Sequence, residues 1–193
     1  SYTFTDVVAD HSIEASFEQT THTITASALA NGTISPSGGM SVVDGAGQSF
    51  TITPTTGYHI DSILVDGVYA GNTSPFNFTN VTANHTILAK FAINQFTITA
   101  TAGLHGSISP SGSVNAAFGS NQTFTITPDT GYHIDTLKVD GVSVAVVSSY
   151  TFFNVSASHT ISATFAPNTL TITVQTSVPG LQVVVDGVTF TSP

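Results

Sequence analysis

Histidine and aspartate are the residue types in this chain whose spacing could support chemistry. His59 lies two positions before Asp61, and His133 lies two positions before Asp135. On a regular β-strand, residues two positions apart share a face, so each pair would place an imidazole beside a carboxylate. Such a pair could be half of an acid–base site or part of a weak metal site. No Gly-x-Ser-x-Gly motif marks a serine nucleophile in the sequence, so we expect no catalytic residues.

Three other histidines, His11, His85 and His159, occupy one repeated position, since 85 − 11 = 74 and 159 − 85 = 74. A zinc site needs three or four ligands that converge on one ion, and equivalent residues in separate copies of a repeat do not converge. We therefore interpret these histidines as strand-start residues whose rings hydrogen-bond the backbone or pack on a phenylalanine.

Calcium is the one metal that the acidic residues near the N-terminus suggest. Asp6, Asp10 and Glu14 lie close together, and calcium takes six to eight oxygen ligands. The sequence nevertheless has no Asp-x-Asp-x-Asp-Gly loop, and Asn80 and Asn84 replace the two aspartates in the next copy. Calcium binding here stays the weaker alternative, and we expect no cofactor.

Aspartate–glycine dipeptides recur between pairs of valines. In a two-residue hairpin loop, both residues take positive φ angles in a type I′ turn, and Asp-Gly suits that turn. We therefore assign a structural turn role to the three dipeptides of this kind, which are Asp66-Gly67, Asp140-Gly141 and Asp186-Gly187.

An internal repeat organises most of the chain. The sequence of residues 57–61 recurs at 131–135, and 131 − 57 = 74. Four other segments recur at the same offset, so no net insertion separates the copies. These segments and their second copies are 34–38 and 108–112, 50–54 and 124–128, 65–68 and 139–142, and 85–87 and 159–161.

The constant offset also predicts the boundaries of the modules. Residues 22–92 and 96–166 form two complete copies, and residues 1–19 align with the last part of a copy. In the tail, Val-Asp-Gly-Val returns early, because 186 − 140 = 46 rather than 74. We therefore expect residues 169–193 to begin a third module of a different type.

Short strands dominate the predicted secondary structure. Apolar and polar residues alternate over Thr23–Ala28, which is typical of a half-buried strand. Tyr58 and Ile60 share a face that Ile63 does not, so we expect a bulge near Asp61-Ser62. Repeating this reading along one copy predicts an all-β module with about six strands. The only helical candidate is a single turn at residues 81–84.

Three motifs in fixed order carry a family resemblance. They are Gly-Tyr-x-Ile-x-x-(Ile/Leu)-x-Val-Asp-Gly, (Phe/Tyr)-x-Phe-x-Asn-Val and His-Thr-Ile-x-Ala-x-Phe, and each occurs in both copies. The chain resembles the divergent internalin B-repeat family of bacterial surface proteins. This resemblance implies a tandem array of small β-modules, either β-grasp-like or Ig-like sandwiches, along a secreted or cell-wall protein. It carries no catalytic residues. Residues 179–187 resemble a different surface module, of the PEGA type.

The composition excludes several classes of partner. Lys90 and Lys138 are the only basic residues besides histidine, and the net charge is −9, so we expect no nucleic-acid partner. No apolar run reaches the roughly 20 residues of a membrane-spanning helix, so we expect no membrane insertion. Charged residues make up only 7 % of the chain, and threonine, serine and asparagine take their place. That surface favours an extracellular or cell-surface location.

Together these observations predict a non-catalytic extracellular repeat region that serves as a stalk, spacer or filament component. A module that binds glycan or cell-wall polymer is the main alternative, and an accessory region of a large secreted enzyme is another. The expected partners are neighbouring repeats of the same protein. The incomplete modules at the two ends fit either a piece of a longer array, which is the simpler explanation, or subunits that complete one another head to tail by strand addition.

Overall fold

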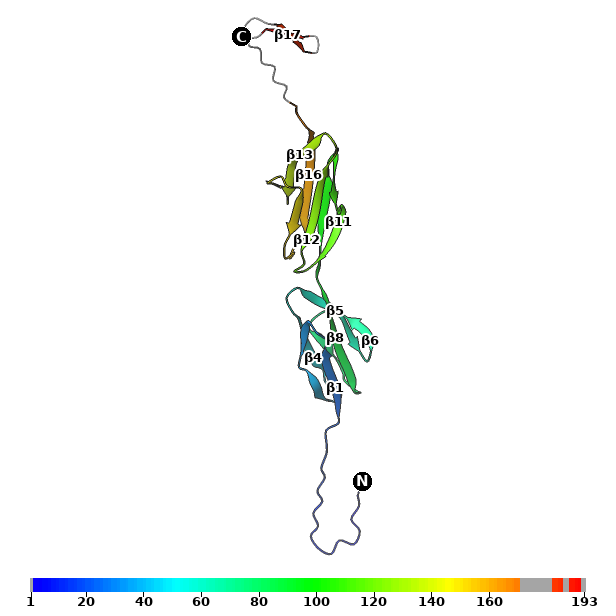
Figure 1. The fold of residues 1–193 in the computed structure, drawn as a ribbon. Coiled ribbons are helices and arrows are strands. Elements are labelled where there is room, and N and C mark those ends of the chain that lie inside the picture. The colour runs from blue at the N-terminus through cyan, green and yellow to red at the C-terminus, as the bar shows by residue number, and fades with distance from the viewer. Residues whose placement is uncertain (1, 171–181, 186–187, 192–193) are drawn as a thin grey trace. The chain divides into compact units, whose positions relative to one another are not determined.

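The computed structural model describes residues 2–170, 182–185 and 188–191 (Figure 1). The chain divides into two compact units, of which the first contains residues up to Phe96 and the second contains most of the residues from Thr97 onward. Strands and irregular segments make up the described residues, and none of these residues is helical. The prediction of an all-β fold in tandem modules is therefore confirmed.

The first repeat folds into eight strands in two sheets. The larger sheet has the strand order β3-β1-β8-β5-β6, and the smaller sheet has the order β2-β4-β7. The strands are β1 (Thr21–Ala28), β2 (Gly32–Ser35), β3 (Gly38–Val43), β4 (Gln48–Pro54), β5 (Tyr58–Val65), β6 (Val68–Gly71), β7 (Phe76–Phe78) and β8 (His85–Ile93).

The first and last strands of this repeat meet at the centre of its larger sheet. Strand β8 pairs in parallel with β1, so that Ile24 lies opposite His85, and it pairs antiparallel with β5 on its other side. Parallel neighbours require a long crossover connection. Strands β2 to β7 supply that connection, and Figure 1 shows β8 within the first unit beside β5.

Alternating side chains of both sheets form one core between them. Ile24 of β1 and Phe50 of β4 are fully buried, while the residues on either side of each face outward. This alternation is the direct consequence of the two-residue period of a strand. The buried core residues are Ile24, Ala26, Ile34, Val42, Phe50, Ile52, Ile63, Val81, Ile87 and Ala89.

The second repeat has the same architecture. Its sheets have the orders β11-β9-β16-β13-β14 and β10-β12-β15. Every buried core position of the first repeat is also buried in the second at an offset of 74, with Ala116 in place of Val42 and Leu137 in place of Ile63, and Phe152 is buried in addition. The strands are β9 (Gln95–Ala102), β10 (Gly106–Ser109), β11 (Gly112–Ala117), β12 (Gln122–Pro128), β13 (Tyr132–Val139), β14 (Val142–Val144), β15 (Ser149–Phe152) and β16 (His159–Pro167).

Several local predictions can be compared with this arrangement. The register of β5 shifts between Ile60 and Ser62, and that of β13 shifts between Ile134 and Thr136, which confirms the predicted bulge. Each repeat has eight strands where the sequence pattern indicated about six, because the edge strands β3 and β6 were not recognised. The glycines at the start of β3 led the sequence analysis to predict a loop, but residues 38–43 all pair with β1. Residues 81–84 form no helical turn.

The two ends of the chain lie outside the two repeats. Residues 2–20 contain no strand. Both described repeats have closing strands of their own, β8 and β16. At the other end, β17 (Gln182–Val185) pairs with β18 (Val188–Thr191), whereas the predicted Asp186-Gly187 turn lies outside the described residues. Within the described ranges, no helix is long and apolar enough to cross a membrane.

Candidate site: a repeated aspartate–histidine clasp

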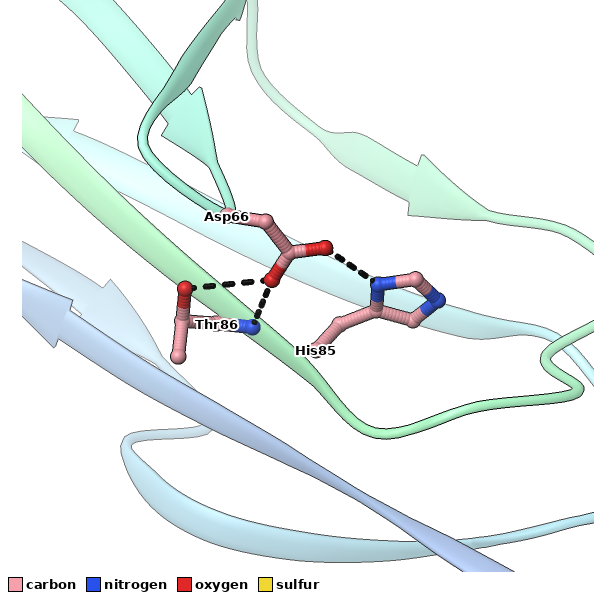
Figure 2. Close-up of polar contacts among 3 residues, drawn as sticks. All are labelled: Asp66, His85 and Thr86. Carbon is pink, nitrogen blue, oxygen red and sulfur yellow. Dashed lines mark hydrogen bonds and ion pairs between the residues drawn. The ribbon is translucent and has the colours of Figure 1, made fainter.

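A polar cluster of each repeat is built on the hairpin turn that precedes an edge strand, which is β6 in the first repeat and β14 in the second. Val65 pairs with Val68, which leaves Asp66 and Gly67 as a two-residue loop. Their φ angles are 51° and 81°, and a type I′ turn requires positive φ at both positions. The turn presents the Asp66 carboxylate to the start of β8, as Figure 2 shows.

Both carboxylate oxygens of Asp66 accept hydrogen bonds from the start of β8. The Nδ1 atom of His85 lies 2.7 Å from Oδ2, and the backbone amide of Thr86 donates to Oδ1 at 2.7 Å (Figure 2). The Thr86 hydroxyl donates to the same Oδ1 at 3.2 Å. In return, the Asp66 amide donates to the Thr86 carbonyl at 3.1 Å. We call this set of contacts among Asp66, His85 and Thr86 the Asp–His clasp.

The second repeat contains the same clasp. His159 Nδ1 lies 2.7 Å from Asp140 Oδ2, and the Thr160 amide donates to Asp140 Oδ1 at 2.8 Å. The Asp140 amide again donates to the Thr160 carbonyl, at 3.0 Å. The φ angles of Asp140 and Gly141 are 51° and 79°, so the turn is also the same. The clasp is therefore a feature of the repeat and is not confined to one copy.

An aromatic ring supports each histidine of the clasp. The rings of Phe78 and His85 have centroids 5.4 Å apart, and those of Phe152 and His159 are 4.9 Å apart. This confirms the predicted packing of histidine on phenylalanine and its position at the start of a strand. The polar partner differs from the prediction, since the ring binds an aspartate side chain and not the backbone.

The hydrogen bonds of the clasp determine its protonation. The hydrogen bond from His85, followed by that from the Thr86 amide, lowers the pKa of Asp66 below the ordinary aspartate value, against a smaller opposing effect of desolvation. The same two donors, His159 and Thr160, lower the pKa of Asp140. An ionised carboxylate is only an acceptor, so Nδ1 must carry the proton that joins each pair. The clasp therefore holds a charged aspartate against a strand terminus, and its direct effect is to fix the hairpin to β8.

The histidine–aspartate pairs that the sequence suggested, two positions apart on one strand, do not form. His59 Nδ1 lies 2.8 Å from Asn94 Oδ1, whereas Asp61 accepts a hydrogen bond from the Ser62 hydroxyl at 3.0 Å. In the second repeat, His133 Nδ1 lies 3.2 Å from Asn168 Oδ1, and Asp135 accepts from Thr136 at 3.0 Å. The expectation of an imidazole beside a carboxylate required a regular strand, and the bulge after Ile60 removes that condition.

The acidic residues considered for calcium lie in the exposed N-terminal segment. Asp6, Asp10 and Glu14 are all exposed there. In the part of the chain that the structure describes, no three histidine, aspartate or glutamate side chains gather into a group that could hold a metal ion.

Sequence reasoning missed the clasp although a signal for it exists. Asp66 and His85 are 19 positions apart, and so are Asp140 and His159. The two members were assigned separate roles, as turn residue and strand-start residue, since nothing in a single copy relates a turn to a distant strand. The preserved spacing between two polar residues in both copies was the available evidence.

A two-sheet β-module repeated at a constant offset, with one internal clasp per copy, defines a tandem-repeat protein. The family model described as the divergent InlB B-repeat domain matches residues 22–95 and 96–169, which together are most of the chain. The chain therefore belongs to the divergent internalin B-repeat family, and its repeats are β-modules of the bacterial surface type. No curated protein and no solved structure matches it.

Proposed function

We propose that this chain is a non-catalytic structural or adhesive repeat region on the outside of a bacterial cell, where it serves as a stalk, spacer or filament component. Family membership supports the surface setting. The low charge and the abundance of threonine and serine agree with an extracellular location. The role within that setting rests on a comparison of the two repeats.

The observation that carries this proposal is the difference between what the repeats share and what they vary. They share the buried core and the Asp–His clasp, which hold each module together. They vary at exposed positions: Tyr69 on β6 corresponds to Ser143, and Asn31 in the turn before β2 corresponds to His105. A repeat that serves only as a structural spacer must keep its core. A repeat that binds a ligand must also keep the exposed surface that recognises the ligand.

Binding of a glycan or cell-wall polymer is the second candidate, and one feature of the second repeat favours it. The rings of His105 and Tyr132 stack with centroids 4.1 Å apart and an interplanar angle of 9°. Leu104 beside them is 83 % exposed. Flat, partly exposed rings of this kind offer apolar area on which a sugar ring can stack. The first repeat has Asn31 at the position of His105, so this surface belongs to one copy only.

A glycan array distinguishes the two candidates. The chain and its His105→Ala/Tyr132→Ala variant would be applied to arrays of bacterial cell-wall polymers and host glycans. The structural proposal expects no selective signal from either protein. Selective binding by the chain that the double variant loses would contradict the structural proposal and establish the second candidate. Labelling of intact and permeabilised cells with an antibody against residues 22–169 tests the location, since an intracellular region would stain only after permeabilisation.

A further inference from the structure

The turn between β1 and β2 contains the single asparagine–glycine dipeptide of the sequence, Asn31-Gly32. Asparagine before glycine is open to a reaction within the chain, because glycine has no side chain that keeps its amide nitrogen away from the asparagine carboxamide. The second repeat has His105-Gly106 at these positions, with a φ angle of 69° at His105 against 75° at Asn31. The two turns therefore share a left-handed bend, and only the first has a carboxamide that can react.

The carboxamide of Asn31 is free to rotate. The residue is exposed, and its side chain makes no hydrogen bond within the part of the chain that the structure describes. Other asparagines are held in place: Asn84 Oδ1 accepts a hydrogen bond from the Thr23 amide at 2.7 Å, and Asn94 Oδ1 lies 2.8 Å from His59 Nδ1. The Asn31 side chain can therefore turn toward the following residue without losing a polar contact.

The amide nitrogen of Gly32 is not used by the sheet. Gly32 lies opposite Pro54, and the Thr55 amide donates to the Asn31 carbonyl at 2.9 Å. That bond makes Gly32 and Pro54 a non-hydrogen-bonded pair, so the Gly32 N–H points away from β4. Strand β2 is an edge strand, and β4 is its one neighbour in the sheet. Removing the Gly32 amide proton therefore costs no hydrogen bond of the ladder.

We propose that Asn31 is a site of spontaneous chemical modification, at which the chain deamidates itself. The Gly32 nitrogen gives its proton to hydroxide and attacks Cγ of Asn31, and the side-chain nitrogen leaves as ammonia. The new C–N bond closes a succinimide ring. Water then adds to either ring carbonyl carbon and breaks the bond of that carbon to the Gly32 nitrogen, which leaves aspartate or isoaspartate. The net change replaces NH2 by OH, and no atom is oxidised or reduced.

The two products affect the first repeat differently. Aspartate keeps the length of the main chain and tolerates a left-handed turn position, so it adds only a negative charge at neutral pH. Isoaspartate routes the main chain through the former side chain and lengthens it by one methylene group next to Gly32. A Cβ atom on Gly32 would lie 2.2 Å from Cζ of Phe91, so the ring leaves no room for the longer chain. Isoaspartate therefore loosens the packing of β2 against β8.

The modification distinguishes the two repeats with time. The reaction needs only water, and ammonia does not return to the chain in dilute solution. It therefore proceeds wherever the folded protein persists. Position 105 is a histidine and has no amide to lose. The first repeat thus gains a charge or a packing defect as the molecule ages, while the equivalent turn of the second repeat stays unchanged.

Timed incubation of the full chain tests the proposal. The folded protein is kept in neutral and in mildly alkaline buffer. Peptides that contain residue 31 are then analysed by mass spectrometry, with a fragmentation method that separates aspartate from isoaspartate. We expect both products at Asn31, at a rate that rises with hydroxide concentration and exceeds the rates at Asn84 and Asn94 several-fold. If Asn31 converts no faster than these two hydrogen-bonded asparagines, the turn protects it and the proposal is wrong.

Two variants are the matched controls, and amide hydrogen exchange is their readout. Asn31→His copies the second repeat and should keep the exchange rates of β2 and β8 unchanged after the same incubation. Freshly prepared Asn31→Asp copies the aspartate product and should also keep them. In the aged unmodified chain, the isoaspartate fraction should exchange faster in β2 and β8 but not in β10 and β16. Full protection of β2 and β8 in that fraction would contradict the packing consequence, and equal loss in both repeats would show that isoaspartate at position 31 is not its cause.

Discussion

Asp66 and His85 lie 19 positions apart in the sequence, but their side chains are 2.7 Å apart in the fold, and Asp140 and His159 repeat this contact at 2.7 Å. The contact connects a hairpin turn at the edge of a sheet with the first residue of its central strand. Equivalent residues form it in both repeats, with Asp140, His159 and Thr160 in the second. The chain therefore preserves this contact together with its core, which makes it the natural place to test how a module is stabilised.

The clasp should make the stability of both repeats depend on pH in the acidic range. Hydrogen bonds lower the pKa values of Asp66 and Asp140 in the folded state. Their contribution to stability is then fully present above the unfolded-state value of about 3.9 and is lost as the pH falls through the lower folded-state value. Urea unfolding from pH 7 to pH 2 should show this loss in the unmodified chain.

The matched variant for this measurement is Asp66→Asn/Asp140→Asn. Asparagine keeps an oxygen for the Thr86 or Thr160 amide, but it cannot ionise. We expect the variant to be less stable at neutral pH and to lose less stability than the unmodified chain below about pH 4. If the free energy of unfolding fell equally with pH in both proteins, the clasp would not contribute to the acid sensitivity.

Glycine at position 32 should be required because an aromatic ring occupies the space beside it. A Cβ atom on Gly32 would clash with the ring of Phe91, and one on Gly106 would clash with Phe165. Gly32→Ala and Gly106→Ala should each lower the free energy of unfolding by about 1–3 kcal/mol, the usual range for overpacking. Gly39→Ala is the control, since its Cβ would lie 3.6 Å from Thr23 Cγ2, an ordinary contact.

A double variant separates this clash from a general effect of substitution. Phe91→Leu gives the new methyl group room, so Gly32→Ala/Phe91→Leu should cost less than the sum of the two single variants. Additive losses in urea unfolding would mean that the ring does not determine the residue at position 32.

Equivalent isoleucines should differ sharply in their contribution to stability. Ile87→Ala and Ile161→Ala remove fully buried side chains, and each should lower the unfolding free energy of its own repeat by about 2–5 kcal/mol. Ile13→Ala changes a side chain that is 70 % exposed and should change stability by less than about 0.5 kcal/mol. Amide exchange resolves the repeats separately, and a large loss for Ile13→Ala would show that the N-terminal segment is packed in solution.

Positions 22 and 44 should tolerate either a polar pair or an aromatic pair of side chains. His22 Nε2 lies 2.7 Å from Asp44 Oδ1, whereas the equivalent Phe96 and Phe118 have ring centroids 6.4 Å apart. We expect His22→Phe/Asp44→Phe to be at least as stable as the unmodified chain, because a polar contact at the surface contributes about 1 kcal/mol or less and an aromatic pair contributes a similar amount.

The two single variants complete a double-mutant cycle for this pair. Each should be less stable than the double variant, since a lone phenylalanine has no aromatic neighbour and the remaining polar partner loses its hydrogen bond. Thermal unfolding measures all four proteins, and a coupling free energy of zero would mean that the two positions act independently.

The sequence by itself determined the period of the repeat, the alternation of the strands and the chemistry of the turns. These features are local, because a strand buries every second side chain and an Asp-Gly loop needs only its own two φ angles. The bulge after Ile60 could be predicted for the same reason, since the face of the apolar residues changes within one strand.

Only the tertiary structure decided which of these elements are neighbours. Alternation shows that a strand is half-buried, but it does not show that β8 lies between β1 and β5. That placement brings Asp66 to His85 and the ring of Phe91 over Gly32. It also explains the edge strand β3, whose first residues Gly38 and Gly39 indicate a loop in the sequence but pair with β1 in the fold. Hydrogen bonds and ring contacts between distant segments depend on strand order, and strand order is a property of the packed core as a whole.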